Sequence, residues 1–254
     1  MKALITGASS GMGRDIAEIL AEKGYDLVIT ARRGNRLSAL KNDIEAKYPS
    51  VSVETVCADL SDKNACIQLY ESLKDKNIDF LINNAGFGLF GEFTETSLED
   101  ELRMIDTNIT AVHILTKLFL KDFVKRDSGI ILNVASSAGF MAGPLMSTYY
   151  ATKNYVRRLT QAVYQEIKNS KSNVKISVLC PGPVNTEFND VANVKFAIDG
   201  LESSFVARYA IEKALKGKLT IIPGKSLKLG VFSLRFLPEK FMLKMSSNIQ
   251  KRKS

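Results

Sequence analysis

The feature that most constrains the fold of this chain is an alternation of short apolar runs with helix-length amphipathic runs. This order is typical of βαβ units, in which successive strands lie parallel and the connecting helices cover the sheet. The expected strands are rich in Val, Ile and Leu, as strands buried on both faces are, and span Lys2–Thr6, Asp26–Thr30, Ser52–Cys57, Phe80–Asn83, Ile130–Val134, Lys175–Leu179 and Leu219–Ile222. The expected helices span Gly11–Lys23, Arg36–Lys47, Lys63–Lys74, Leu98–Lys125, Thr148–Asn169 and Phe205–Lys216. The pattern predicts a doubly wound α/β fold.

The sequence contains no boundary at which a second folding unit would begin. Its 254 residues suit one α/β domain, and it has no internal repeat or Pro/Gly-rich linker. Hydrophobic residues make up 45% and charged residues 24%, which is the balance of a globular protein. We expect one domain over residues 1–224, with residues 225–254 as a basic amphipathic extension of it.

The cysteines and the hydropathy pattern favour a reducing, aqueous compartment. Cys57, Cys66 and Cys180 have unrelated spacings, which match neither a disulfide framework nor a zinc site. No charged region followed by an apolar stretch precedes the first expected strand, and no run of about 18 apolar residues occurs. His113 is the single histidine and has no metal-ligating neighbours in the sequence. We therefore expect a cytoplasmic protein without a bound metal.

The first expected strand ends in a glycine-rich turn that runs directly into the first expected helix. The turn reads Thr6-Gly7-Ala8-Ser9-Ser10-Gly11-Met12-Gly13. Glycines let a backbone turn tightly and approach a pyrophosphate, and the helix presents free N–H groups and the positive end of its dipole to that anion. A strand–helix turn without a ligand would also accept these glycines, but their place after the first strand favours a nucleotide site.

The end of the second expected strand indicates which dinucleotide this site prefers. NAD-selective sites carry an acidic residue about 20 residues past the glycines, where it binds the ribose 2′-hydroxyl. This chain has Arg32 and Arg33 there and no acid. Two guanidinium groups could hold the 2′-phosphate of NADP(H), although they could also be the solvated start of the next helix. We predict NADP(H) as the cofactor in preference to NAD(H).

A tyrosine and a lysine four residues apart form the candidate acid/base pair. Tyr149 and Lys153 share one face of the expected helix Thr148–Asn169. A nearby ammonium group lowers the pKa of a phenol from its reference value of about 10, and makes proton exchange with a substrate oxygen feasible. Tyr150 is followed at the same spacing by Asn154, which offers no charge. A Tyr–Lys pair at this spacing is also common on protein surfaces. The residues around it therefore decide whether it is catalytic.

Two polar residues lie where they could assist this pair. Ser136 follows the fifth expected strand, and ligands of parallel sheets bind at the carboxyl ends of strands. Its hydroxyl could hold a carbonyl or alkoxide oxygen; Ser137 is the alternative, and either could simply cap the loop. Asn108 stands inside the expected helix Leu98–Lys125, where an amide is a mild helix breaker. A buried amide could bind main chain and water there and belong to a proton path.

At these residues the sequence resembles the short-chain dehydrogenase/reductase family. The run Thr6–Gly13 reads as the family's Thr-Gly-x-x-x-Gly-x-Gly turn. The other matching motifs are Asn83-Asn84-Ala85-Gly86 after the fourth strand, the tetrad Asn108, Ser136, Tyr149 and Lys153, and Pro181-Gly182-Pro183-Val184-x-Thr186 after the sixth strand. These motifs extend over roughly residues 2–222.

The resemblance implies a Rossmann-type fold with a seven-stranded parallel sheet in the order 3-2-1-4-5-6-7. It implies hydride transfer between nicotinamide and a carbonyl or secondary alcohol, with Ser136 orienting the oxygen and Tyr149 as general acid/base. Lys153 would bind the nicotinamide ribose and, with a water held by Asn108, relay protons; homo-oligomers are common in the family. Together with the two arginines, the expected cofactor-binding residues are Gly7, Ala8, Ser9, Ser10, Gly11, Met12, Arg32, Arg33, Asp59, Leu60, Asn84, Ala85, Gly86, Tyr149, Lys153, Pro181, Gly182, Val184 and Thr186.

Substrate choice is expected to lie in the loops after the strands, at residues 87–93, 140–146 and 187–201. Their apolar side chains are Phe87, Leu89, Phe90, Phe140, Met141, Leu145, Met146, Phe188 and Phe196. This set favours a small, apolar carbonyl compound, such as an acyl chain or a polycyclic ketone, unless the side chains simply pack onto the core. The predicted reaction is reduction of an apolar ketone or acyl-type group.

The last segment carries nearly all of the net charge of +8. Residues 225–254 hold eight Lys/Arg and one acid, Glu239, whereas residues 1–224 hold 27 basic and 26 acidic residues. A basic amphipathic segment can lie on an anionic membrane surface, cover an apolar substrate mouth or pack on a partner subunit. Its interleaved apolar residues and the lack of a recognition motif argue against nucleic-acid binding.

Two other functions fit parts of the sequence. Epimerases and dehydratases that retain their cofactor are typically longer chains with a Gly-x-x-Gly-x-x-Gly turn, which the run Thr6–Gly13 does not match. A non-catalytic NADP(H) sensor or membrane-associated scaffold would account for the basic tail. It would not require Ser136, Tyr149 and Lys153 together, which favours an enzyme.

Overall fold

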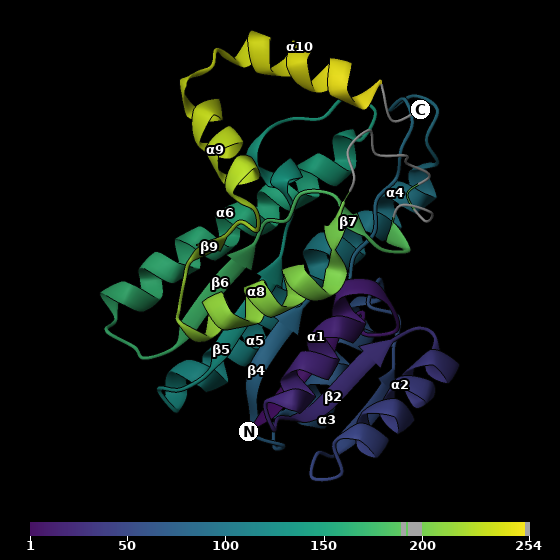
Figure 1. Cartoon of the computed structure of the whole chain (residues 1–254), viewed down its shortest axis with the longest axis vertical. Helices are drawn as coiled ribbons and strands as arrows, with labels where there is room; N and C mark the ends of the chain where they lie inside the picture. The colour runs from purple at the N-terminus through teal and green to yellow at the C-terminus, as the bar shows by residue number, and fades with distance from the viewer. Residues whose placement is uncertain (189–191, 193–199, 252–254) are drawn as a thin grey trace.

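The centre of the molecule is a parallel sheet with helices on both faces (Figure 1). The computed structural model describes residues 1–188, 192 and 200–251. The strands of the sheet are β1 (Lys2–Thr6), β2 (Asp26–Ala31), β3 (Val53–Cys57), β4 (Ile78–Asn83), β5 (Ile130–Val134), β6 (Lys175–Leu179) and β9 (Thr220–Ile221). Their order is β3-β2-β1-β4-β5-β6-β9, and every neighbouring pair is parallel. This confirms the predicted Rossmann-type fold and strand order.

Two helical layers cover the sheet. The helices are α1 (Gly11–Glu22), α2 (Gly34–Lys47), α3 (Lys63–Leu73), α4 (Leu98–Ile105), α5 (Ala111–Lys125), α6 (Ser147–Asn169) and α8 (Ser203–Leu215). Successive strand residues point to opposite faces: Ala3 and Ile5 pack with α1, α2 and α8, whereas Leu4 packs with α3, α5 and α6. The apolar strands therefore fill two cores, one on each face, and their carboxyl ends are left to form the site.

The single helix expected over Leu98–Lys125 is interrupted by a π-helical turn at Asp106–Thr110. Asn108 lies in this turn and is fully buried. Its amide nitrogen donates to the carbonyl of Phe87 at 2.9 Å, and its amide oxygen accepts from the Phe87 N–H at 3.1 Å. The helix widens where a side chain must reach the loop after β4, and such bulges are frequent at functional sites.

A buried polar ladder ties the strand ends to the helices behind them. The side-chain amide of Asn83 donates to Thr116 at 3.0 Å and to Asn133 at 2.8 Å, and the amide of Asn133 donates to Thr160 at 3.0 Å. All four residues are buried, where an unmade hydrogen bond would cost about 1–3 kcal/mol. The ladder fixes the ends of β4 and β5 against α5 and α6.

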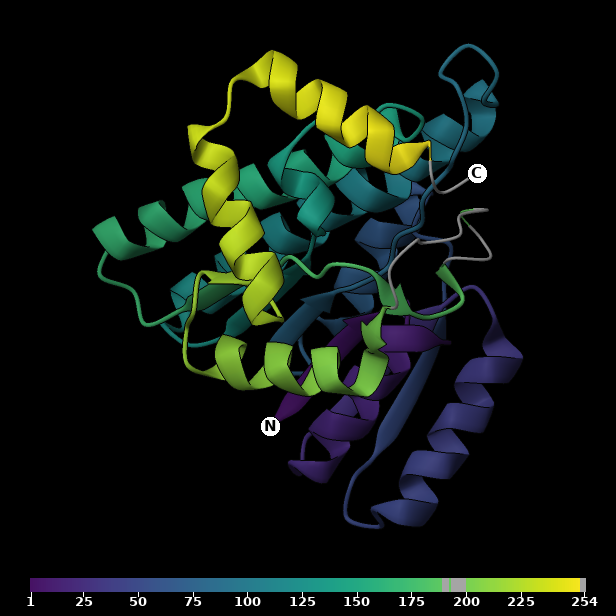
Figure 2. The same ribbon diagram turned by 45° about the horizontal axis from the view of Figure 1, so that its top comes forward.

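The chain beyond β6 adds parts that the sequence pattern did not predict. Val184–Asn185 (β7) and Leu201–Glu202 (β8) form a separate two-stranded parallel sheet. The tail forms α9 (Lys225–Ser233), a 3₁₀ turn at Leu234–Phe236 and α10 (Glu239–Gln250). These two helices make a bent arm along one side of the molecule, drawn in yellow in Figures 1 and 2. Within the described residues, no helix is both long and apolar enough to cross a membrane.

Candidate active site

The glycine turn is packed so closely at Gly7 and Gly13 that neither position has room for a side chain. A Cβ atom at Gly13 would lie 2.3 Å from the carbonyl oxygen of Gly7. Gly7 itself has a positive φ of 67°, and a Cβ there would lie 2.8 Å from Cα of Ala85. The side-chain amide of Asn84 donates to the carbonyls of Thr6 and Gly7 at 2.9 and 3.2 Å. The turn is thus held against the end of β4, with the N-terminus of α1 beside it.

One continuous cavity runs along the carboxyl ends of the strands. It is lined by every residue expected to bind the cofactor except Ala8, which is fully buried beneath the turn. The glycine cradle, the free N-terminus of α1 and the cationic end at Arg32 and Arg33 suit a phosphorylated dinucleotide in shape and charge. The residues present therefore fit NADP(H), and Asp59, Leu60 and Lys153 are among those that would hold it.

Arg33 is held in place at one end of this cavity. Its guanidinium donates to the hydroxyls of Ser9, at 3.0 and 3.2 Å, and of Ser10, at 2.8 Å. It also forms an ion pair with Glu187 at 3.0 Å, and Arg36 pairs with the other oxygen of the same carboxylate. Hydrogen bonds from Arg36 and Arg33 hold the pKa of Glu187 below its usual value. The turn after β1, the end of β2 and the loop after β7 therefore meet in one cationic corner.

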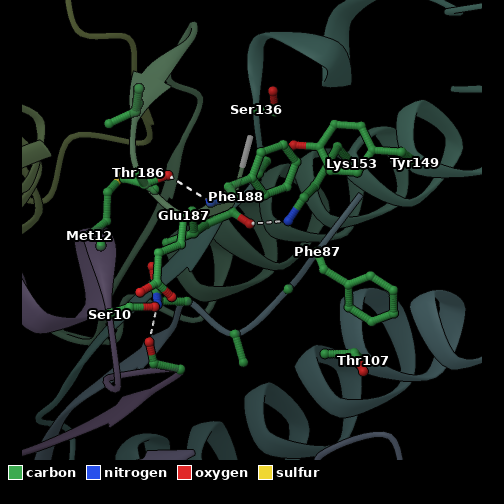
Figure 3. A pocket seen from close by; sticks show the side chains of 18 of the residues that line it. Ser10, Met12, Phe87, Thr107, Ser136, Tyr149, Lys153, Thr186, Glu187 and Phe188 are labelled. Atoms are coloured by element: carbon green, nitrogen blue, oxygen red, sulfur yellow. Dashed lines mark hydrogen bonds between the residues drawn. The ribbon is translucent and has the colours of Figure 1, made fainter. Parts of the chain in front are cut away.

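The opposite end of the cavity holds the candidate acid/base pair (Figure 3). Tyr149 and Lys153 project from α6, and Ser136 lies just beyond β5. Tyr149 is 8% exposed and Lys153 is 5% exposed. The Lys153 ammonium donates to the carbonyl of Val134 at 3.1 Å and lies 5.8 Å from the centre of the Tyr149 ring. The sequence spacing therefore brings these three side chains together as expected.

Burial governs the protonation of this pair. It raises the pKa of Tyr149 above its ordinary value, while the hydrogen bond from Ser136 acts in the opposite direction. Burial also lowers the pKa of Lys153 to about 8. The expectation that Lys153 would lower the pKa of Tyr149 therefore fails for the protein alone, because loss of solvent outweighs any charge effect. The phenol of Tyr149 is accordingly protonated at neutral pH.

Asn108 lies behind the cavity wall and does not line the cavity. A Cβ atom at Gly86 would lie 2.8 Å from the amide oxygen of Asn108 and 3.2 Å from the Lys153 ammonium. Asn108 also donates to the hydroxyl of Thr152 at 3.1 Å. These contacts place Asn108 beside the lysine, with its amide hydrogen bonds directed to the loop at Phe87 and to α6.

The wall next to Tyr149 is apolar. Of the apolar loop residues singled out in the sequence, Phe87, Met146 and Phe188 line the cavity. Leu89 and Phe90 pack beside them, while Phe140 packs against the guanidinium of Arg157, 3.8 Å from its ring centre. Met141 lines a second cavity beneath α10, Leu145 adopts a positive φ of 64°, and Phe196 lies outside the described residues.

Sequence reasoning missed two residues of the cationic corner and one of the apolar wall. In the sequence, Arg36 is only the expected start of a helix, and Glu187 only the start of a loop. Tyr150 lines the cavity, and its hydroxyl accepts a hydrogen bond from Gln250 of α10. The spacing of Arg33 and Arg36 by three residues, one helical turn, was a signal for a shared anion. The contact with Gln250, 100 residues away, left no signal in the sequence.

Comparison with known proteins establishes the family. A family model described as short chain dehydrogenase matches residues 1–195. An uncharacterized oxidoreductase of Staphylococcus saprophyticus is 33% identical over 215 residues, which are 83% of this chain and 91% of that protein. The chain is a member of the short-chain dehydrogenase/reductase family and an oxidoreductase.

Two further relatives have more specific descriptions. The very-long-chain 3-oxoacyl-CoA reductase of Mycosarcoma maydis is 34% identical over 181 residues, 70% of this chain and 51% of that protein. The chain thus matches about half the length of that relative. A short-chain dehydrogenase from Sphingobium yanoikuyae, solved in complex with NADPH, has 32% identity and a TM-score of 0.85 over 92% of each chain.

Proposed function

We propose that the protein is an NADP(H)-dependent reductase of apolar ketones or acyl-type carbonyl compounds. One observation carries this proposal: a single cavity joins the Arg33 corner to Tyr149, Lys153 and Ser136. The cationic corner lies where the glycine turn and the end of β2 would place the ribose of a bound dinucleotide. The similarity to a dehydrogenase solved with NADPH supports the same cofactor.

The groups at the other end of the cavity suit proton transfer to a carbonyl oxygen. The cofactor, when bound, supplies a hydride to the carbonyl carbon. Ser136 donates a hydrogen bond that orients the oxygen, and Tyr149 transfers its phenolic proton to that oxygen, so that the carbonyl becomes a hydroxyl. The raised pKa of Tyr149 keeps this proton available at neutral pH. The Lys153 ammonium stabilises the phenolate left behind.

The apolar wall supports the proposed class of substrate. Phe87, Met146 and Phe188 surround the reacting end. The acidic residues among the described lining of the cavity are Asp59 and Glu187, and Glu187 is paired in the cationic corner. A sugar would leave several hydroxyls without partners against such a wall. The very-long-chain 3-oxoacyl-CoA reductase among the relatives acts, by its name, on a carbonyl group of an acyl chain. We infer that 3-oxoacyl compounds and bulky ketones are the substrates to try first.

The test is carbonyl-dependent oxidation of NADPH. The purified protein is given NADPH with a series of 3-oxoacyl thioesters, bulky ketones and, as a polar control, a ketose. The proposal predicts absorbance loss at the nicotinamide band with the apolar carbonyls, and its disappearance in Tyr149→Phe. Binding of NADPH without any turnover would instead favour a sensor.

We further propose that the C-terminal arm, residues 225–251, contacts an anionic membrane surface. Leu229 and Phe236 are 68% and 73% exposed, and Phe232 and Phe241 are also exposed. These side chains are interleaved with basic residues and with one acid, Glu239. Acidic lipid complements this charge, whereas the same face on a second copy would bring basic residues together.

Sedimentation of the full chain with vesicles tests the membrane contact. The protein is expected to co-sediment with phosphatidylserine-containing vesicles, and Phe236→Ser/Phe241→Ser to remain in the supernatant. Pure phosphatidylcholine vesicles provide the charge control. Equal partitioning of the two proteins would contradict the proposal.

A further inference from the structure

The carboxylate of Glu187 occupies the corner in which the proposed cofactor would place its 2′-phosphate. Its two oxygens pair with different guanidinium groups, one with Arg33 at 3.0 Å and the other with Arg36. Arg33 remains tied to Ser9 and Ser10 through its other N–H groups. A carboxylate bridging two guanidinium groups has the negative sign and the bidentate geometry of a bound phosphate oxygen pair.

A cofactor phosphate and this carboxylate cannot share the corner. Each would need the same two guanidinium groups, and two anions at one site repel each other. The side chains of Arg33, Arg36 and Glu187 are 42–45% exposed, so their ion pairs are partly screened and can be exchanged. The 2′-phosphate of NADP(H) carries more charge than a carboxylate, and NAD(H) carries no phosphate at this position.

Phe188, the residue after Glu187, packs against Tyr149, the candidate acid. The ring of Phe188 is 5.4 Å from that of Tyr149, centre to centre, and packs in the same apolar cluster. Its tip is so close to Gly88 that a Cβ there would lie 2.8 Å from it. Figure 3 shows Glu187 directed toward Ser10 and Phe188 directed toward the end of the cavity that holds Tyr149. One dipeptide therefore joins the two ends of the cavity.

We propose that Glu187 is an internal competitor for the 2′-phosphate site, and that its displacement by NADP(H) moves Phe188 away from Tyr149 to admit the carbonyl substrate. This inference rests on the proposed function. Glu187 thereby acts as a specificity-determining residue: only a cofactor with a 2′-phosphate releases it. The apolar substrate site would open after the cofactor has bound.

Cofactor titration of Glu187→Gln tests the competition. The variant keeps the size of the side chain but loses its charge, so NADPH is expected to bind about threefold tighter or better, with NADH changed less than about twofold. Glu22→Gln is the matched control, because it removes the same charge from an exposed ion pair with Arg208 at 2.7 Å, away from the cavity. It is expected to bind NADPH as the wild type does.

A fluorescent reporter tests the coupling to the substrate end. The chain contains no tryptophan, so Phe188→Trp provides a single emitter beside Tyr149. Adenosine 2′,5′-bisphosphate fills only the adenosine end, and it is expected to change the emission, whereas ADP, which lacks the 2′-phosphate, is not. In Phe188→Trp/Glu187→Gln the emission is expected to start in the changed state and to respond to neither ligand.

Two results would overturn the inference while leaving the proposed function intact. One is an NADPH affinity that Glu187→Gln leaves unchanged or weakens while the wild type still prefers NADPH. The other is equal emission changes with adenosine 2′,5′-bisphosphate and ADP. A wild type that does not bind NADPH would contradict the proposed function together with the inference.

Discussion

The two ends of the cavity differ in how deeply their titratable and charged side chains are buried. At the reacting end, Tyr149 and Lys153 are 8% and 5% exposed, and burial moves both pKa values. In the cationic corner, the side chain of Arg33 is 42% exposed and its ion pair with Glu187 is partly screened. A buried group acts through a fixed geometry and a perturbed pKa, whereas exposed groups select a ligand by exchangeable charge pairs.

The largest effect that this comparison predicts is at the buried end. Tyr149→Phe removes the proton donor without changing the ring, so kcat is expected to fall about 10³-fold, as for loss of a general acid. NADPH affinity, measured by titration, is expected to stay within about twofold of the wild type. Tyr150→Phe is the matched control, since its hydroxyl contacts Gln250 and no candidate catalytic group. Equal losses in both variants would mean that the acid has been misassigned.

The pH dependence should come from Lys153. Below its pKa of about 8 the side chain is an ammonium group, and above it the charge is lost. Since kcat/KM for NADPH reports groups of the free enzyme, this parameter is expected to decline as pH rises through 8, by about tenfold per pH unit at the limit. Lys153→Arg keeps the charge at all these pH values. For this variant, kcat/KM for NADPH is expected to be lower than in the wild type but independent of pH. A decline with rising pH in Lys153→Arg would mean that another group titrates.

A smaller effect, on stability, is expected behind the cavity wall, beside Lys153. Asn108→Ala leaves the partly buried N–H and carbonyl of Phe87 without their partner, which costs about 1–3 kcal/mol. The free energy of unfolding, measured with urea, is expected to fall by that amount. Asn154→Ala, also on a helix near the site but bonded only to carbonyls, serves for comparison. An unchanged free energy of unfolding in Asn108→Ala would show that water replaces the hydrogen bonds of the amide.

The smallest effect is expected at the exposed end. Raising NaCl from about 0.05 to 0.5 M shortens the Debye length to a few ångströms. NADPH binding is expected to weaken by about threefold more than NADH binding, because only NADPH would use the exposed arginines. Identical salt dependence for both cofactors would indicate that neither arginine contacts the ligand.

The sequence predicted the parts of this structure that depend on local pattern. The glycines of the run Thr6–Gly13 have a fixed spacing because they pack against the chain itself. Tyr149 and Lys153 have a fixed spacing because they lie one turn apart on a helix. The parts that were missed depend on distant contacts. Glu187 meets Arg33 across 154 residues, and Gln250 meets Tyr150 across 100.

The interrupted helix illustrates the same limit within one element. The apolar period of Leu98–Lys125 correctly placed helical structure there, and Asn108 was expected to be a mild breaker. The π-helical turn at Asp106–Thr110 arises because its amide bonds the backbone of Phe87, 21 residues earlier. Local propensity identified the residue, and only the tertiary contact determines the geometry.

Cofactor titration shows whether Arg33 selects NADP(H) for the cavity in which Tyr149 is proposed to perform the chemistry. NADPH and NADH are titrated against the wild type and Arg33→Ala, with Arg32→Ala alongside to separate the two arginines. The wild type is expected to prefer NADPH at least about tenfold, or roughly 1.4 kcal/mol, and Arg33→Ala is expected to lose this preference. Equal affinity for both cofactors, unaffected by either substitution, would contradict this expectation.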